Sequence, residues 1–277
     1  MKTSTKIFFA KILSNIIRFF IELNGKNSEK LKIKRNNIFF LLNLTEGIDF
    51  AIYLNLYERK VVKFYSKIID SNSNILDIGS NIGFHTLNFA NLLSTGKVFS
   101  IEPTSFAIKK LKKNINLNRF LKKKIIYDQI FFTNSKNNFK NKIYASWPLK
   151  NNNNIHPILM GEEKDASKSK IESLDSYIFR KKINNLNLIK IDVDGNEFDI
   201  INSGKKTIRK FRPIIMIEFC PYLHKDNDLD FLIKFFNKMN YDFIDSSNSK
   251  KLKLNNVTDL KKKIIFGSSK NIFLVPK

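Results

Sequence analysis

Cysteine and histidine are scarce in this chain of 277 residues, which contains one cysteine, Cys220, and three histidines. A single cysteine excludes an intrachain disulfide and a cysteine-rich metal site, and it fits a reducing compartment. No histidine flanks Cys220 in the sequence, so we expect a small buried side chain rather than a nucleophile. A cytoplasmic protein is therefore expected.

Acidic residues are also few: 25 stand against 49 lysines and arginines, which gives a formal net charge of +24. Such an excess often indicates nucleic acid or an anionic surface as the partner. Here it accompanies an abundance of Lys, Asn, Ile and Phe, which share A/T-rich codons, and no motif that reads RNA or DNA is present. We interpret the charge as compositional and expect no nucleic-acid partner.

A long uninterrupted apolar run is missing. Residues 7–23 read IFFAKILSNIIRFFIEL and are interrupted by Lys11, Arg18 and Glu22, whereas a membrane-spanning helix needs about 20 apolar residues with few charges. A signal peptide would need an unbroken apolar stretch and a cleavage site. The charged residues and Asn15 recur at steps of three and four, which predicts one polar stripe on an otherwise apolar helix. Residues 4–23 are thus expected to pack on their own domain, on a second subunit or on a membrane surface, and the oligomeric state stays open.

The rest of the chain has a regular organisation. A hydrophobic content of 43% is enough for a core, and we divide the chain into an N-terminal region, 1–45, and one domain, 46–277. Strands are expected at 31–44, 74–78, 97–101, 125–132, 186–193, 213–219, 241–244 and 271–275, and helices at 54–69, 84–93, 106–117, 198–211 and 229–239. The alternation predicts an α/β fold with a parallel sheet covered by helices on both faces. The polar stretch 134–170 predicts a substrate-side hairpin and loop.

Two of the nine glycines stand four residues apart in the stretch DIGSNIG, which begins at Asp77 and joins the first strand of this pattern to a helix. Ligands in such sheets lie beyond the carboxyl ends of the strands, and glycine lets the backbone turn and approach them. Asp77 replaces the first glycine of the dinucleotide motif G-x-G-x-x-G, which disfavours a pyrophosphate. An acid there suits an ammonium group, and Glu102, at the end of the next strand, can accept two ribose hydroxyls. S-Adenosylmethionine has both groups, although either acid alone could also be a helix cap or a solvated strand end.

A second group of charges lies in LIKIDVDGNEFD, residues 188–199. In a strand, Lys190, Asp192 and Asp194 point to the same face. Buried charges pair with one another or with a ligand, so these three residues and Glu197 are candidates for a site. A structural ion-pair network is the alternative.

These stretches resemble the FkbM family of S-adenosylmethionine-dependent methyltransferases. The resemblance covers about residues 50–220 and rests on ESLDSY, LIKIDVDGNEFDII with the following Gly204, RPIIMIEF, LDIGSNIGFHT and IEPT. Ser80 stands where the family usually has Ala, and Asp194 where it has Glu. The family implies a Rossmann-like class I methyltransferase fold, a seven-stranded sheet whose last strand is antiparallel, and O-methylation of a sugar, glycan or natural-product hydroxyl. The cofactor contacts expected are Asp77, Gly79, Ser80, Asn81, Gly83, His85, Glu102 and Pro103.

For the chemistry, Asp192 and Asp194 are the first candidates to orient or deprotonate the acceptor, followed by Glu197, Glu218 and Lys190. No metal site is assigned, although a divalent ion remains an alternative if Asp192 and Glu218 converge. His85 is expected to line the transfer site or to contact backbone in the first turn of its helix. Trp147 is expected to stack on a sugar ring or to belong to the core or a lid.

Two other functions remain open at this point. An NAD(P)-dependent oxidoreductase or epimerase shares the fold logic, but the first glycine and a Tyr-x-x-x-Lys pair are missing. A non-catalytic membrane- or glycan-associated protein would explain the amphipathic N-terminus, but the candidate cofactor residues are all present.

Overall fold

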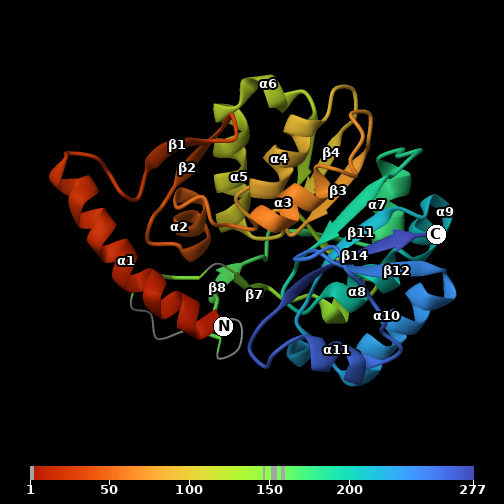
Figure 1. Ribbon diagram of the computed structural model, residues 1–277. Helices are drawn as coiled ribbons and strands as arrows, with labels where there is room; N and C mark the ends of the chain where they lie inside the picture. The colour runs from red at the N-terminus through yellow and green to blue at the C-terminus, as the bar shows by residue number, and fades with distance from the viewer. Residues whose placement is uncertain (1–2, 146, 151–154, 157–159) are drawn as a thin grey trace.

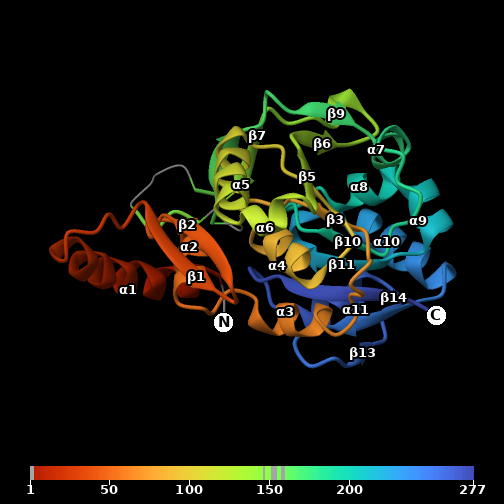
Figure 2. The same ribbon diagram turned by 90° about the horizontal axis from the view of Figure 1, so that it is seen from above.

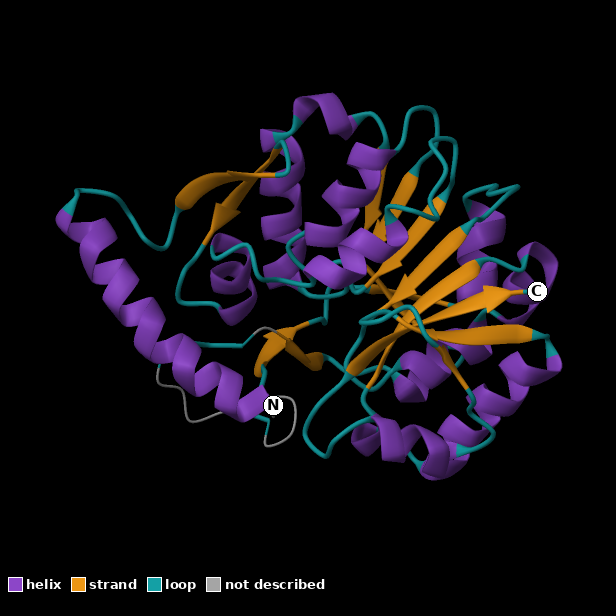
Figure 3. Cartoon of the chain, viewed as in Figure 1, coloured by secondary structure: helices purple, strands orange, loops and turns teal. Residues whose placement is uncertain are grey.

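The chain is described from a computed structural model, which covers residues 3–145, 147–150, 155–156 and 160–277. Its centre is an eight-stranded sheet with the order β13-β12-β14-β11-β10-β3-β4-β5 (Figures 1 and 3). Neighbouring strands from β11 to β5 are parallel, whereas β14 is antiparallel to both β11 and β12. The mostly parallel α/β sheet is thereby confirmed. Its strands are β3 (Ile75–Ile78), β4 (Val98–Ile101), β5 (Ile125–Asp128), β10 (Leu188–Ile191), β11 (Ile214–Phe219), β12 (Tyr241–Asp245), β13 (Lys251–Leu252) and β14 (Lys270–Pro276).

The predicted count of seven strands is wrong by one. The additional strand is β13, which pairs antiparallel with Phe243 and Ile244 of β12 at the edge of the sheet. A strand of two residues is too short to produce an alternating pattern, so the sequence carries no signal for it.

Helices cover both faces of the sheet. One face packs against α3, α4 and α5, and the other against α7 to α11. Strands β3, β4 and β10 are buried at every position, as expected for short, mostly apolar runs between two helical layers. The helices are α1 (Thr3–Leu23), α2 (Gly47–Tyr53), α3 (Arg59–Tyr65), α4 (Phe84–Leu92), α5 (Ser105–Leu117), α6 (Arg119–Lys122), α7 (Leu174–Arg180), α8 (Glu197–Ser203), α9 (Lys205–Phe211), α10 (Asp226–Lys238) and α11 (Val257–Lys263), with 3₁₀ turns at Lys136–Asn138 and Pro221–Leu223.

Four predicted elements are shortened or divided in the structure. The strand region expected at 31–44 forms two strands, β1 (Leu31–Arg35) and β2 (Ile38–Leu42). The helix expected at 54–69 is reduced to α3, because Asn55 and Glu58 adopt left-handed backbone conformations, with φ of 56° and 43°. The strand expected at 125–132 splits, and β6 (Ile130–Phe132) leaves the main sheet to pair with β9 (Lys170–Glu172). The helix expected at 198–211 breaks into α8 and α9 at Gly204, where a Cβ atom would lie 2.3 Å from a methyl carbon of Leu174.

The N-terminal region begins with α1 and continues as an antiparallel hairpin of β1 (Leu31–Arg35) and β2 (Ile38–Leu42). The side-chain amides of Asn114, on α5, and of Asn118, at the end of α5, bind the backbone of β2. Figure 2 shows α1 at the outer edge of the molecule, apart from the main sheet. None of the helices in the described residues is both long enough and apolar enough to span a membrane.

The hairpin predicted within 134–170 is present as β7 (Lys142–Ala145) and β8 (Glu162–Asp165). Part of the predicted loop lies outside the described residues. After β7, the carbonyl of Trp147 accepts a hydrogen bond from the Gly47 amide at the start of α2. The hairpin is thereby joined to the beginning of the domain.

Candidate active site

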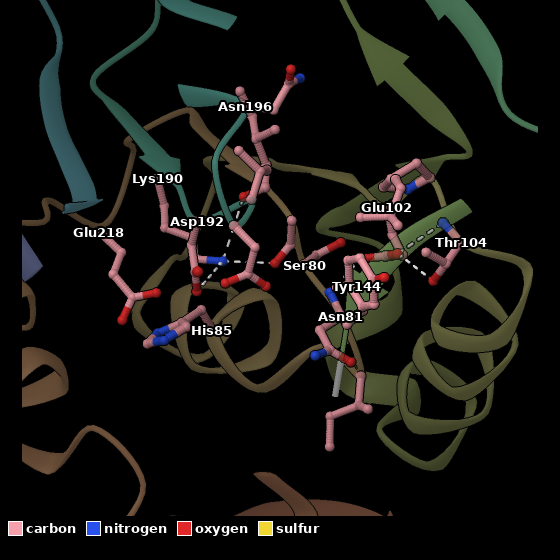
Figure 4. A pocket seen from close by; sticks show the side chains of 18 of the residues that line it. Ser80, Asn81, His85, Glu102, Thr104, Tyr144, Lys190, Asp192, Asn196 and Glu218 are labelled. Atoms are coloured by element: carbon pink, nitrogen blue, oxygen red, sulfur yellow. Dashed lines mark hydrogen bonds and ion pairs between the residues drawn. The ribbon is translucent and has the colours of Figure 1, made fainter. Parts of the chain in front are cut away.

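A cavity lies at the carboxyl ends of the central strands. It holds about 1280 Å³ of space, including open solvent, and its walls come from the loops after β3, β4 and β10, from Glu218 of β11 and from the β7 segment. Figure 4 shows Lys190, Asp192, Glu218 and His85 towards one end of this cavity, and Asn81, Glu102 and Thr104 towards the other. Two groups of residues that are distant in the sequence thus share one pocket.

The glycine pair after β3 has a structural cause. Gly79 has a φ of +75°, and a Cβ atom on it would lie 1.9 Å from the carbonyl oxygen of Asp192. The loop after β3 therefore packs directly on the loop after β10, and only glycine leaves room for that contact. Gly83 has a φ of +90° and precedes α4, where a Cβ atom would meet the end of the Leu111 side chain at 2.5 Å. Gly83 shapes the turn but does not line the cavity.

Glu102 lines the cavity and is held in place by three donors. Its Oε1 accepts hydrogen bonds from the amide and hydroxyl of Thr104, at 2.9 and 2.6 Å, and its Oε2 accepts one from the Asn81 amide at 2.9 Å. Burial raises the pKa of Glu102, although these hydrogen bonds oppose the change. A carboxylate offers about four acceptor positions, so one remains for a ribose hydroxyl, and rotation of the Thr104 hydroxyl would release a second.

Lys190 connects Asp77, from the stretch DIGSNIG, with Asp192, from the stretch LIKIDVDGNEFD. Its Nζ lies 3.3 Å from Asp77 Oδ1, 3.3 Å from Asp192 Oδ2 and 2.7 Å from the Gly79 carbonyl oxygen. Burial alone would lower the pKa of Lys190, but the two carboxylates outweigh it and raise that pKa. Asp77 is fully buried, accepts a hydrogen bond from the Thr86 hydroxyl at 2.6 Å, and does not line the cavity. Asp77 therefore holds Lys190 in place and does not contact the ammonium group of a ligand.

The pKa values of the acidic residues around Asp192 are shifted in different directions. Burial acts to raise the pKa of Asp192, but Lys190 and a hydrogen bond with Glu218 lower it. Desolvation within the cavity, followed by the Asp192 charge, raises the pKa of the half-buried Glu218 well above the usual carboxyl range. The pKa of Asp194 shifts in the same direction, although its side chain is exposed. Asp194 also has a left-handed backbone, with φ of 50°. Asp192, whose pKa is lowered, therefore lies beside Glu218, whose pKa is raised, a division typical of sites that move protons.

His85 and a residue absent from the sequence prediction complete this end of the cavity. Glu58 Oε2 lies 2.6 Å from His85 Nε2, and its Oε1 accepts a hydrogen bond from Asn271 at 2.8 Å. His85 Nδ1 lies 3.3 Å from the Tyr65 hydroxyl. Glu58 stands in a turn before α3, outside any motif, so only the tertiary structure brings it to the cavity. His85 thus contacts the side chains of Glu58 and Tyr65 and lines the cavity. This position corresponds to the first of the two predicted for it, and contact with backbone was the other.

Other predicted site residues have different positions. Ser80, Asn81, Pro103 and Asp194 line the cavity. Glu197 does not line it: it accepts a hydrogen bond from the Gly195 amide at 3.0 Å and pairs with His224 Nε2 at 2.8 Å. It holds the loop that carries Asp194. No group of three or more His, Cys, Asp or Glu side chains in the described part of the chain is arranged to hold a metal ion.

The ESLDSY stretch supports the fold rather than the cavity. The Ser173 hydroxyl caps α7 by accepting a hydrogen bond from the Ser176 amide at 3.1 Å. Asp175 accepts one from the Thr207 amide at 2.8 Å, in the first turn of α9. Together with the contact between Leu174 and Gly204, these bonds fix the joint between α7 and α9.

Comparison with known proteins identifies the family. Residues 77–243 match the methyltransferase FkbM domain. The chain belongs to this family. S-Adenosyl-L-methionine is therefore its cofactor, which sets aside the NAD(P)-dependent alternative. No curated protein matches the chain in sequence.

Among solved structures, the FkbM-family chain is similar to methyltransferase FkbM from Methylobacillus flagellatus KT, with 14% identity and a TM-score of 0.48 over 80% of this chain and 50% of that one. The chain thus spans half the length of that protein. It is also similar to P. horikoshii TYW2 in complex with MeSAdo, with 13% identity and a TM-score of 0.46 over 94% of this chain and 81% of that one. Precorrin-6y C5,15-methyltransferase from Geobacter metallireducens has 11% identity and a TM-score of 0.41, over 79% and 88% of the two chains.

The side chains of the cavity fit this cofactor. Five acidic side chains line it, against two lysines: Glu58, Glu102, Asp192, Asp194 and Glu218, against Lys140 and Lys190. An acidic cavity in a chain of net charge +24 is complementary to a ligand that carries a sulfonium and an ammonium group. Glu102 has acceptor capacity for its ribose. The same charge pattern disfavours a pyrophosphate.

Proposed function

We infer that the protein transfers a methyl group from S-adenosyl-L-methionine to a hydroxyl oxygen of a sugar, a glycan or a natural product. The observation that carries this inference is the ionised Asp192, fixed by Lys190 at 3.3 Å and hydrogen-bonded to Glu218, in the same cavity as Glu102. A carboxylate held in this way accepts a hydrogen bond from a hydroxyl group and fixes its direction.

The reaction needs a base at the acceptor and an electrophilic methyl group. When bound, the cofactor supplies the methyl group on a sulfonium. Asp192 orients the acceptor hydroxyl and receives its proton as the oxygen–carbon bond forms. Glu218, whose pKa is raised, shares a hydrogen bond with Asp192, while Lys190 is a positioning residue that holds Asp192 and the loop after β3 together.

The acidity of the cavity supports an acceptor without phosphate groups. Ionised phosphates would be repelled by the carboxylates, whereas the hydroxyl groups of a sugar donate hydrogen bonds to them. Tyr144 and Trp147 add aromatic surface to the lining. Aromatic rings with polar edges suit a ligand that is part apolar and part hydroxylated.

The test measures methyl transfer from labelled S-adenosyl-L-methionine to a panel of monosaccharides and oligosaccharides, with the linkage of the product determined by mass spectrometry. The Asp192→Asn variant should lower kcat by a factor of about 100 or more, and the affinity for S-adenosylhomocysteine should change little. Asp226→Asn, on the exposed surface of α10, is the matched control and should keep full turnover. Full turnover by Asp192→Asn, or methyl groups found only on nitrogen, would contradict the proposal.

A further inference from the structure

The outer side of α1 is an exposed apolar surface. Eight large apolar residues are between 43% and 66% exposed on this one helix: Phe8, Phe9, Ile12, Leu13, Ile16, Phe19, Phe20 and Leu23. At 100° per residue, they fall within an arc of about 140°. Among the described residues they form the largest run of exposed apolar side chains on any helix. We call these eight residues the α1 apolar face.

The α1 apolar face does not belong to the side of the helix that docks on the domain. The docked side is formed by Ile7, Ser14 and their neighbours, and the Ser14 hydroxyl donates a hydrogen bond of 2.6 Å to the Leu44 carbonyl. The helix also packs against α2. Because Ser14 is fully buried on the opposite side, the helix is fixed in rotation with its apolar face directed away from the protein. The polar stripe that contains Lys11 and Arg18 lies between the two sides.

Exposed lysines lie near both ends of this face. Residues 1–35 contain nine lysines and arginines and two glutamates. Lys6 is exposed beside the α1 apolar face, and Lys26 and Lys30 are exposed just beyond the end of the helix. Two copies of the chain that met through this face would bring these like charges together, whereas anionic lipid headgroups would neutralise them. A helix with an aromatic and aliphatic face bordered by basic residues is typical of helices that lie in the plane of a membrane interface.

We propose that α1 binds the surface of an anionic lipid bilayer, with its apolar face inserted at the boundary between headgroups and acyl chains. The proposal concerns a surface remote from the catalytic cavity and does not rest on the proposed reaction. It also accounts for the exposure of eight large apolar side chains, which a protein with no partner there would rarely leave in contact with water.

The test is co-sedimentation of the full chain with vesicles of phosphatidylcholine alone and of phosphatidylcholine with phosphatidylglycerol. We expect at least tenfold more protein on the anionic vesicles. The triple variant Phe9→Asp, Ile16→Asp, Phe20→Asp should lose at least nine-tenths of that binding. Its matched control places the same three charges at exposed apolar positions elsewhere, as Phe120→Asp, Phe179→Asp, Ile265→Asp, and should bind like the unmodified chain.

A second set of variants tests the contribution of the lysines to membrane binding. Lys6→Gln, Lys26→Gln, Lys30→Gln should weaken binding to anionic vesicles several-fold, whereas Lys238→Gln, Lys253→Gln, Lys262→Gln, at other exposed positions, should not. Circular dichroism and binding of S-adenosylhomocysteine confirm that each variant is folded. Three results would each overturn the proposal: no binding to either vesicle, equal binding by the α1 triple variant and its control, or a dimer in solution that the α1 triple variant converts to monomer without any binding to vesicles.

Discussion

The contact between Gly79 and Asp192 permits a sharp prediction. Gly79→Ala would place a Cβ atom 1.9 Å from the Asp192 carbonyl oxygen and 2.9 Å from its carbonyl carbon. The left-handed backbone costs an alanine about 1–2 kcal/mol, and relieving the overlap costs about 1–3 kcal/mol more. Gly79→Ala should therefore lower the free energy of unfolding by about 2–5 kcal/mol, which lowers the Tm by about 10 °C in a protein of this size.

Gly267 is the matched control, since it has the same φ of +75° and a Cβ atom on it would meet nothing within 4 Å. Gly267→Ala should cost only about 1–2 kcal/mol. Denaturant melts of both variants measure the difference, and titration with S-adenosylhomocysteine should show weaker binding for Gly79→Ala alone, because the overlap separates two loops of the cavity. Equal losses of stability in the two variants would refute the assignment of Gly79 to this close contact.

Three further predictions concern the charges of the cavity. Lys190→Met leaves the buried carboxylate of Asp77 and the half-buried carboxylate of Asp192 without their cation. It should lower the free energy of unfolding by about 3–5 kcal/mol in urea melts. The pKa of Glu218 is raised in the folded state. Its stabilising contribution is therefore complete below the unfolded pKa of about 4.3, and is lost as pH rises through the folded pKa. Urea melts at about 25 °C should thus show that Glu218→Gln gains stability relative to the unmodified chain between about pH 5 and pH 8. Glu102→Gln should weaken binding of S-adenosylhomocysteine about tenfold by calorimetry, through the loss of charged hydrogen bonds to ribose.

Much of the fold follows from local sequence. β3, β4 and β10 are short, mostly apolar runs, and each is completely buried in the sheet. Their carboxyl ends had to share one edge, so the loops that contain Asn81, Glu102 and Asp192 could be expected to meet. The cavity is lined by all three.

Features set by tertiary packing could not be predicted. β6 follows β5 after a single residue, Gln129, and its pairing with β9 separates it from the main sheet. Glu58 reaches the cavity because the chain turns before α3. No sequence motif includes Glu58, so the sequence gives no sign of this position. The helical wheel of α1 indicated a polar stripe, but it did not show that the apolar residues are divided between a docked side and an exposed one. The buried hydrogen bond of Ser14 decides that division.

The side chains of Asp77 and Glu197 show the limit of reasoning from charge patterns. Both acids were expected at the site, and both are buried: Asp77 supports Lys190, and Glu197 supports the loop at Gly195. A sequence pattern reports that charged groups cluster, but whether an acid faces the ligand or the group behind it depends on rotamers and packing.

The central claim is that the acidic cavity binds S-adenosyl-L-methionine and presents Asp192 to an acceptor. Titration calorimetry of the full chain with S-adenosylhomocysteine, and separately with NAD and NADP, tests the first half most directly. We predict one site per chain for S-adenosylhomocysteine, weakened by Glu102→Gln, and no heat of binding with either dinucleotide. Binding of NAD or NADP, or no binding of S-adenosylhomocysteine by a folded protein, would contradict the account.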